Sequence, residues 1–207
     1  MKIPFDLNNV YTKTYTEPPL DKREILRYSG ACGSVPELDA LIDECLTELD
    51  GALTYKVCWR TFDVSTDGDL LDLDFTKTAS AALSKNLHGC QKIILFAATV
   101  GIGLDRLIAR YSRVSPSKAL IFQSIGAERI EALCDTFCAE MAELAKGNGY
   151  SLRPRFSPGY GDLALSVQRD IFSVLDCSRK IGLTLNDSLL MSPTKSVTAI
   201  IGIMPDN

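Results

Sequence analysis

Hydrophobic residues recur every three or four positions in five segments of the chain, and this spacing predicts helices. The five segments are 34–49, 77–88, 103–111, 116–146 and 165–181. Ser34 to Glu37 forms a capping-box pattern at the start of the first segment, with a proline inside the first turn. In the 116–146 segment the apolar positions run from Phe122 to Leu144 without a break, which predicts one long helix.

Two other segments alternate between apolar and polar residues, and two more are almost wholly apolar. The alternation at 53–58 and 71–75 predicts a pair of antiparallel strands with one face in solvent. The apolar run 93–98 predicts a strand covered on both faces, and 196–203 predicts a final strand. We expect residues 1–33, which are polar and turn-rich, to form an N-terminal arm beside a domain over 34–207. The mixture predicts one α+β domain.

Composition and charge narrow the classes of partner. The chain has 207 residues, 46% of them hydrophobic and 23% charged, which is typical of a soluble globular protein. A net charge of −4 with dispersed basic residues argues against nucleic acid as a partner. The longest apolar run is too short for a membrane span, and the start lacks a signal-peptide pattern. Seven cysteines without framework spacing then indicate reduced thiols and a cytoplasmic location.

The turn at Gly101 and Gly103 permits two interpretations. It follows an apolar strand and opens a helix, which is the context of a dinucleotide-binding loop. However, Arg106 stands in place of the third glycine, and no second parallel strand with an acidic residue follows. A methyltransferase with a nucleotide loop here would need a parallel sheet. The alternative is a tight turn whose glycines permit close packing.

The segment 150–162 holds the densest group of residues suited to ligand binding. Arg155 offers a planar fork for a carboxylate, Tyr160 offers a flat ring, and Gly159 allows a ligand close to the backbone. This combination suits a small zwitterion that carries a ring. Glu131 on the long predicted helix is close enough for the loop to fold back, so that Arg155 and Glu131 approach one ligand. The alternatives are an ordered surface loop and a solvated helix carboxylate.

The same loop resembles a signature of a known family. Residues 155–160 read Arg-Phe-Ser-Pro-Gly-Tyr, which is similar to the R-x-x-x-G-Y motif of the reactivation domain of cobalamin-dependent methionine synthase. Residues 181–202 resemble that family's I-G-x-x-L-x-x-S-x-x-M-x-P-x-x-S-V-S-G segment. The segments 27–30, 97–101 and 127–133 are similar to stand-alone relatives of the domain. The ordered matches extend from about residue 27 to residue 203 of this sequence.

This resemblance implies a C-shaped α+β domain with helices around a twisted, mainly antiparallel sheet. It also implies that the arginine loop holds S-adenosylmethionine, with Arg155 on the methionine carboxylate. Glu131, or its neighbour Ala132 if the match shifts by one position, would face the ammonium or the sulfonium. Three loop residues would line the adenosine side: Ser157, Gly159 and Tyr160.

The resemblance further implies a function carried out with other proteins. The domain would support the reductive methylation of cobalamin bound to a separate methionine synthase or other corrinoid methyltransferase. A flavodoxin-like protein, or another donor, would supply the electron. Gly149 stands where the full-length enzymes have a glutamate, and their tyrosines beyond the last strand have no counterpart before Asn207. These differences favour an alternative, a capping module for a corrinoid protein that has lost the ligand.

Overall fold

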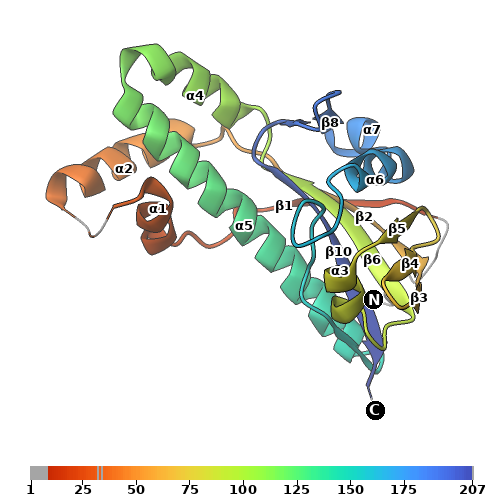
Figure 1. Cartoon of the computed structure of the whole chain (residues 1–207). Helices are drawn as coiled ribbons and strands as arrows, with labels where there is room; N and C mark the ends of the chain where they lie inside the picture. The colour runs from red at the N-terminus through yellow and green to blue at the C-terminus, as the bar shows by residue number, and fades with distance from the viewer. Residues whose placement is uncertain (1–8, 32, 34, 207) are drawn as a thin grey trace.

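The chain is built around a five-stranded antiparallel sheet with the strand order β1-β2-β6-β10-β7 (Figure 1). The computed structural model describes residues 9–31, 33 and 35–206. The strands of this sheet are β1 (Tyr11–Tyr15), β2 (Tyr55–Asp63), β6 (Lys92–Thr99), β10 (Ser196–Pro205) and β7 (Tyr150–Leu152). All four pairings between neighbours are antiparallel, which confirms the α+β class.

The central strand β6 is buried on both faces, as its apolar run predicts. Side chains alternate across a strand, so Phe96 points into one hydrophobic cluster and Leu95 into the other. Both side chains are fully buried. β10 divides in the same way, with Ile201 in the first cluster and Ile200 in the second. The two middle strands therefore separate two hydrophobic cores.

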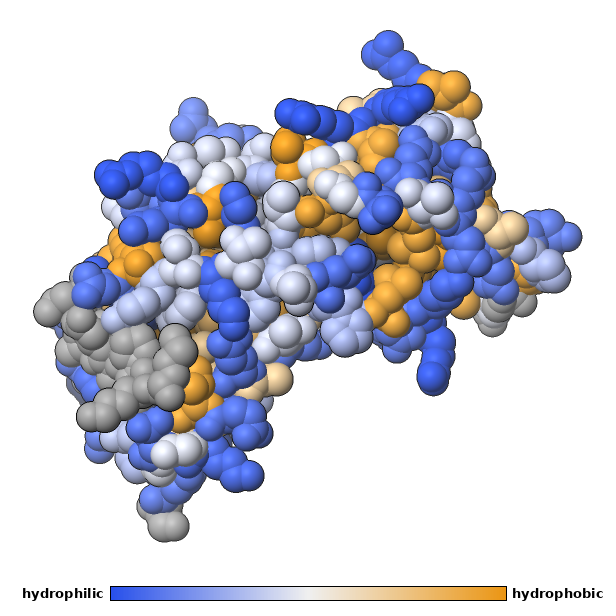
Figure 2. All heavy atoms as spheres, turned by 180° about the vertical axis from the view of Figure 1, so that it is seen from behind, coloured by the Kyte–Doolittle hydropathy of each residue, from blue (hydrophilic) through white to orange (hydrophobic). Residues whose placement is uncertain are grey.

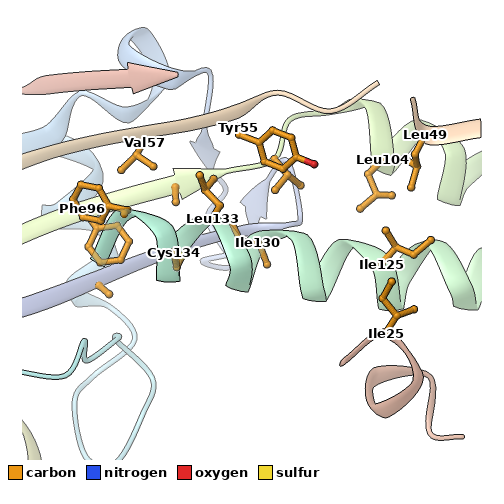
Figure 3. Packing of buried hydrophobic residues seen from close by; sticks show 14 of the residues in the cluster. Ile25, Leu49, Tyr55, Val57, Phe96, Leu104, Ile125, Ile130, Leu133 and Cys134 are labelled. Carbon is orange, nitrogen blue, oxygen red and sulfur yellow. The ribbon is translucent and has the colours of Figure 1, made fainter. Parts of the chain in front are cut away.

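One core lies between the sheet and α5 (Pro116–Lys146), a helix of 31 residues. Figure 3 shows Ile130, Leu133 and Cys134 of this helix facing side chains of β2 and β6. Three further helices pack against α5: α1 (Lys22–Ser29), α2 (Pro36–Leu49) and α4 (Gly103–Val114). The long helix predicted at 116–146 is confirmed.

The other core is covered by short elements. They comprise the helices α3 (Ala81–Asn86), α6 (Val167–Leu175) and α7 (Cys177–Ile181), a three-stranded sheet of β3 (Ser65–Asp67), β4 (Leu70–Asp72) and β5 (Lys77–Ala79), and the pair β8 (Thr184–Leu185) and β9 (Met191–Ser192). α6 and α7 were expected as one helix over 165–181. Asp176 between them has φ 50° and ψ 46°, and this left-handed conformation ends α6.

Two further predictions from the spacing were wrong in detail. The segments 53–58 and 71–75 do not pair with each other, because β2 lies between β1 and β6 while β4 belongs to the small sheet. β2 also has buried residues on both faces, so it has no solvent face. The helix expected over 77–88 begins only at Ala81, where the Ser80 side chain accepts a hydrogen bond from the Leu83 amide. β5 occupies the residues before it.

The described part of the expected N-terminal arm contains two elements that the spacing did not predict. β1 adds an edge strand to the main sheet, and α1 packs against α5 through the fully buried Ile25. The predicted capping box falls partly on Ser34, which lies outside the described residues. The structure has Val35 at the N-cap position of α2.

The turn between β6 and α4 is a close-packed turn, and the antiparallel sheet contradicts the nucleotide-loop interpretation. Gly101 has φ 84°, and a Cβ atom there would lie 2.3 Å from Thr54 Oγ1. A Cβ atom on Gly103 would lie 2.1 Å from the backbone oxygen of Ala52. Both glycines are therefore needed because the chain before β2 passes directly over this turn.

Candidate functional site

A cavity of about 430 Å³ opens beside the first half of β10. β10 is paired with β6 along one edge, but β7 pairs only with residues 203–205 on the other edge. The cavity therefore occupies the stretch of that edge that β7 leaves uncovered. Its lining residues come from α5, the loop after β7, α6, β9 and β10: Glu131, Arg155, Phe156, Ser157, Pro158, Tyr160, Gln168, Met191, Ser196, Val197 and Thr198.

An isolated β-bridge pairs the loop after β7 with β10. The Phe156 amide donates to the Ile200 oxygen at 2.8 Å, and the Ile200 amide donates to the Phe156 oxygen at 2.9 Å. Because the bridge sets the direction of the chain, the neighbouring residue Arg155 extends toward α5. The loop thus folds back onto this helix, as its length and sequence predict.

Arg155 and Glu131 meet at the cavity wall. The Arg155 Nη2 atom donates to Glu131 Oε2 at 2.5 Å and to Asp135 Oδ1 at 3.1 Å. Among the described residues, neither Nε nor Nη1 of Arg155 has an acceptor. One quarter of the Arg155 side chain is exposed. The two carboxylates thus orient the guanidinium while two edges of its fork stay available for a ligand.

The other predicted site residues lie at different depths. Ser157 and Tyr160 line the cavity, and Tyr160 stands on its rim with 71% of its surface exposed. Gly159 is not among the lining residues. It forms a turn with φ 89°, and its amide donates to the Leu163 oxygen at 2.9 Å. Ala132 lies outside this cavity, in a neighbouring hollow between α1 and α5.

Several lining residues were not predicted as site residues. Met191, Ser196 and Val197 belong to the segment that resembles the reactivation domain, so their place in the sequence could have indicated them. Thr198 belongs to the same segment. Gln168 carries no local sequence signal, because only the fold brings α6 to β10. Asp135 contacts Arg155 without lining the cavity, and it lies one helical turn after Glu131, which is the spacing of neighbours on a helix face.

Asp162 ties the cavity loop to the start of α3. Its carboxylate accepts hydrogen bonds from the Ser80 hydroxyl and from the amides of Ala81 and Ala82, at 2.5, 2.8 and 3.2 Å. These bonds hold the pKa of the Asp162 carboxyl below its usual range, and the bond from Ser80 makes the largest contribution. The ionised carboxylate therefore stabilises the folded loop.

The pH dependence of this tie follows from the direction of the pKa shift. We expect Asp162→Asn to be less stable than the native protein above about pH 5, where the carboxylate is ionised in both the folded and the unfolded chain. This difference should shrink as the pH falls through the folded-state pKa, because both states then become protonated. Urea unfolding of both proteins between pH 7 and pH 3 measures it. A difference that stays constant with pH would contradict the role of the charge.

The nearby thiols and acids do not form a reactive or metal-binding group. Burial raises the pKa of the Cys138 thiol to about 11 and that of Cys134 further, so both stay protonated near neutral pH. Among residues 9–31, 33 and 35–206, no group of three histidine, cysteine or acidic side chains is arranged to hold a metal ion. Within the same ranges, no helix has the length and apolar character that crossing a bilayer requires.

A second cavity, of about 760 Å³, lies between α2, β2 and α5. Figure 2 shows hydrophobic side chains gathered on the half of the molecule that carries α1, α2 and α4. The buried polar groups of this second cavity already have protein partners. Arg129 donates to Glu128 and to the Pro18 oxygen, and the Tyr55 hydroxyl donates to Glu17. The first cavity is the better candidate because several of its polar atoms, among them Gln168 Oε1 and Thr198 Oγ1, have no partner among the described residues.

The fold and the cavity together define an α+β domain with a cavity of small-molecule size at the uncovered edge of an antiparallel sheet. No family model and no curated protein sequence matches the chain. Among solved structures, it is similar to the MetH reactivation domain in a crystal structure with bound AdoHcy, with a TM-score of 0.67 and 16% sequence identity. The match covers 96% of this chain and 79% of that one. The chain therefore has the fold of the MetH reactivation domain.

Proposed function

We propose that the protein binds S-adenosylmethionine in the cavity beside β10 and holds it for methyl transfer to a cobalamin on another protein. The observation that carries the proposal is the Arg155–Glu131 pair at the cavity wall, in which Arg155 is also held by Asp135. It occurs in a fold that, in the MetH reactivation domain, is seen with AdoHcy bound.

The charges of the group and of the ligand are complementary. Arg155 and the two carboxylates that it contacts, Glu131 in the cavity lining and Asp135 outside it, have a net charge of −1. S-adenosylmethionine has one carboxylate, one ammonium and one sulfonium, which give a net charge of +1. The free donors of Arg155 would bind the ligand carboxylate, and Glu131 would face its cationic groups. The cavity volume also lies within the usual range for small-molecule sites.

In the proposed function the chemistry belongs to the ligand and to the partner. An electron donor, flavodoxin-like or of another kind, reduces cobalt(II) to cobalt(I), and the sulfonium methyl passes to cobalt(I) to give methylcobalt(III) and S-adenosylhomocysteine. Residues of this chain bind and orient the methyl donor. The cobalamin is carried by a methionine synthase or another corrinoid methyltransferase that docks over the open cavity.

The test is calorimetric titration of S-adenosylmethionine into the native protein and into Arg155→Ala. We expect saturable binding by the native protein and a loss of about ten- to a hundredfold in affinity for the variant, because hydrogen bonds to a charged group contribute about 1.5–3 kcal/mol. Arg113→Ala, which removes an exposed arginine at the far end of α4, should bind as the native protein does.

Two outcomes would count against the proposal. Native-like binding by Arg155→Ala would mean that the arginine does not hold the ligand. If the native protein binds no S-adenosylmethionine, either alone or with a cobalamin-binding methyltransferase present, the capping-module alternative is favoured. A pull-down with that methyltransferase would then test the capping role directly.

A further inference from the structure

Two buried polar side chains of the cavity have oxygen atoms without hydrogen-bond partners. Within the described ranges, four buried side-chain atoms lack a partner, and two of them are Gln168 Oε1 and Thr198 Oγ1. Gln168 is 5% exposed and Thr198 is 2% exposed. Both line the cavity. Since buried polar atoms are nearly always paired, these two are placed for a partner that comes from outside the chain.

The backbone of Thr198 faces the same space. Ile200 exchanges both of its backbone hydrogen bonds with Phe156, so its amide and oxygen point away from β6. Backbone groups alternate between the two edges of a strand, and Thr198 lies two residues before Ile200. Its amide and oxygen therefore also point to the uncovered edge, where the cavity lies. One residue thus offers a hydroxyl, an amide and a carbonyl to this end of the cavity.

This end lies across the sheet from the charged group. Arg155 extends toward α5, which covers one face, whereas Gln168 belongs to α6, which covers the other. An elongated ligand anchored at Arg155 would therefore reach the polar end with its far group. Neutral donors and acceptors beside a strand edge suit a planar heterocycle that has an amino group next to a ring nitrogen.

We propose that Gln168 and Thr198 recognise the hydrogen-bonding edge of the adenine ring and make the site selective for a 6-aminopurine over a 6-oxopurine. The inference rests on the proposed function, since it concerns the ligand bound at Arg155. The Gln168 side-chain oxygen accepts from the 6-amino group. Thr198 supplies hydrogen bonds from its hydroxyl and its backbone. In this orientation of the Gln168 amide a 6-oxo group would place one acceptor against another, and the amide would have to turn its NH2 group inward to bind it.

The experiment compares S-adenosylhomocysteine with S-inosylhomocysteine by calorimetric titration. We expect the native protein to prefer the adenine compound by about tenfold or more. Gln168→Leu and Thr198→Val should each weaken binding of the adenine compound by roughly three- to tenfold and reduce the preference. Native binding without any preference, or variants that keep the full preference, would overturn this inference alone. Absence of binding by the native protein would overturn the proposed function as well.

Thermal stability separates a ligand-recognition role from a structural one. Because the two oxygen atoms have no partners among the described residues, their removal breaks no hydrogen bond seen there, and Tm should stay unchanged or rise. Thr99→Val is the matched control, since buried Thr99 Oγ1 accepts hydrogen bonds from the Ser196 hydroxyl and the Gly101 amide. It should lower Tm and leave the purine preference intact. A lower Tm with unchanged preference in Thr198→Val would indicate a structural residue.

Discussion

Arg129→Leu should lower the free energy of unfolding by about 3–5 kcal/mol, because it leaves a buried charge without its partner. Arg129 is fully buried, and its Nε and Nη2 atoms donate to both carboxylate oxygens of Glu128 at 2.5 and 2.6 Å. It also donates to the backbone oxygens of Pro18 and Pro19. The substitution removes the partner of the Glu128 charge and of two carbonyl groups at once.

Urea unfolding followed by circular dichroism measures the loss. The double variant Arg129→Leu with Glu128→Gln should recover part of it, because the uncompensated charge is gone. Arg110→Leu is the control, since Arg110 is 68% exposed and its ion pair with Glu48 is long, at 3.4 Å. That variant should stay within about 0.5 kcal/mol of the native protein. A loss below about 1 kcal/mol for Arg129→Leu would show that the buried pair contributes little.

Phe137→Ala should also destabilise the protein by about 3–5 kcal/mol, in this case by creating a cavity. Phe137 is fully buried on α5. Its ring centroid lies 4.8 Å from that of Phe96 and 5.5 Å from that of Trp59. The ring therefore joins the long helix to two neighbouring strands, β6 and β2, and its loss removes contacts with both of them.

The fluorescence of Trp59, the single tryptophan of the chain, reports on this substitution directly. We expect Phe137→Ala to change the emission of the folded protein and to lower its unfolding midpoint in urea. Leu120→Ala removes an apolar side chain from the same helix, but at a position that is 51% exposed, and should have a small effect. Equal losses for the two variants would contradict the cavity explanation.

The elements that could be predicted from the sequence are those whose burial leaves a hydrophobic pattern in their own residues. β6 is apolar from Ile93 to Ala98 because both of its faces are buried, and α5 keeps its apolar spacing because one side packs on the sheet. β1 could not be predicted in this way, since its middle residues are exposed and it is held by pairing with β2. The break at Asp176 depends on one backbone conformation that the spacing does not encode.

The residues of the candidate site also fall into two groups, those that local sequence could predict and those that depend on tertiary packing. Arg155 and Glu131 could be predicted, because one loop and one helix of known length can bring them together. Gln168 could not, since its approach to β10 depends on the packing of α6 across the sheet from α5. Gly159 was expected at the ligand for its bare backbone, yet its conformation serves the turn that presents Tyr160.

The pairing of β6 with β10 also has a consequence for how the chain reaches this structure. Ser196 contacts Thr99 across that pairing, and the two residues are 97 positions apart in the sequence. Such a contact forms only after a long segment, α5 included, has been brought into place, and loop closure of this kind slows folding. We therefore expect α5 and its helical neighbours to gain protection from amide exchange early during refolding. The edge of β10 that borders the cavity should form late.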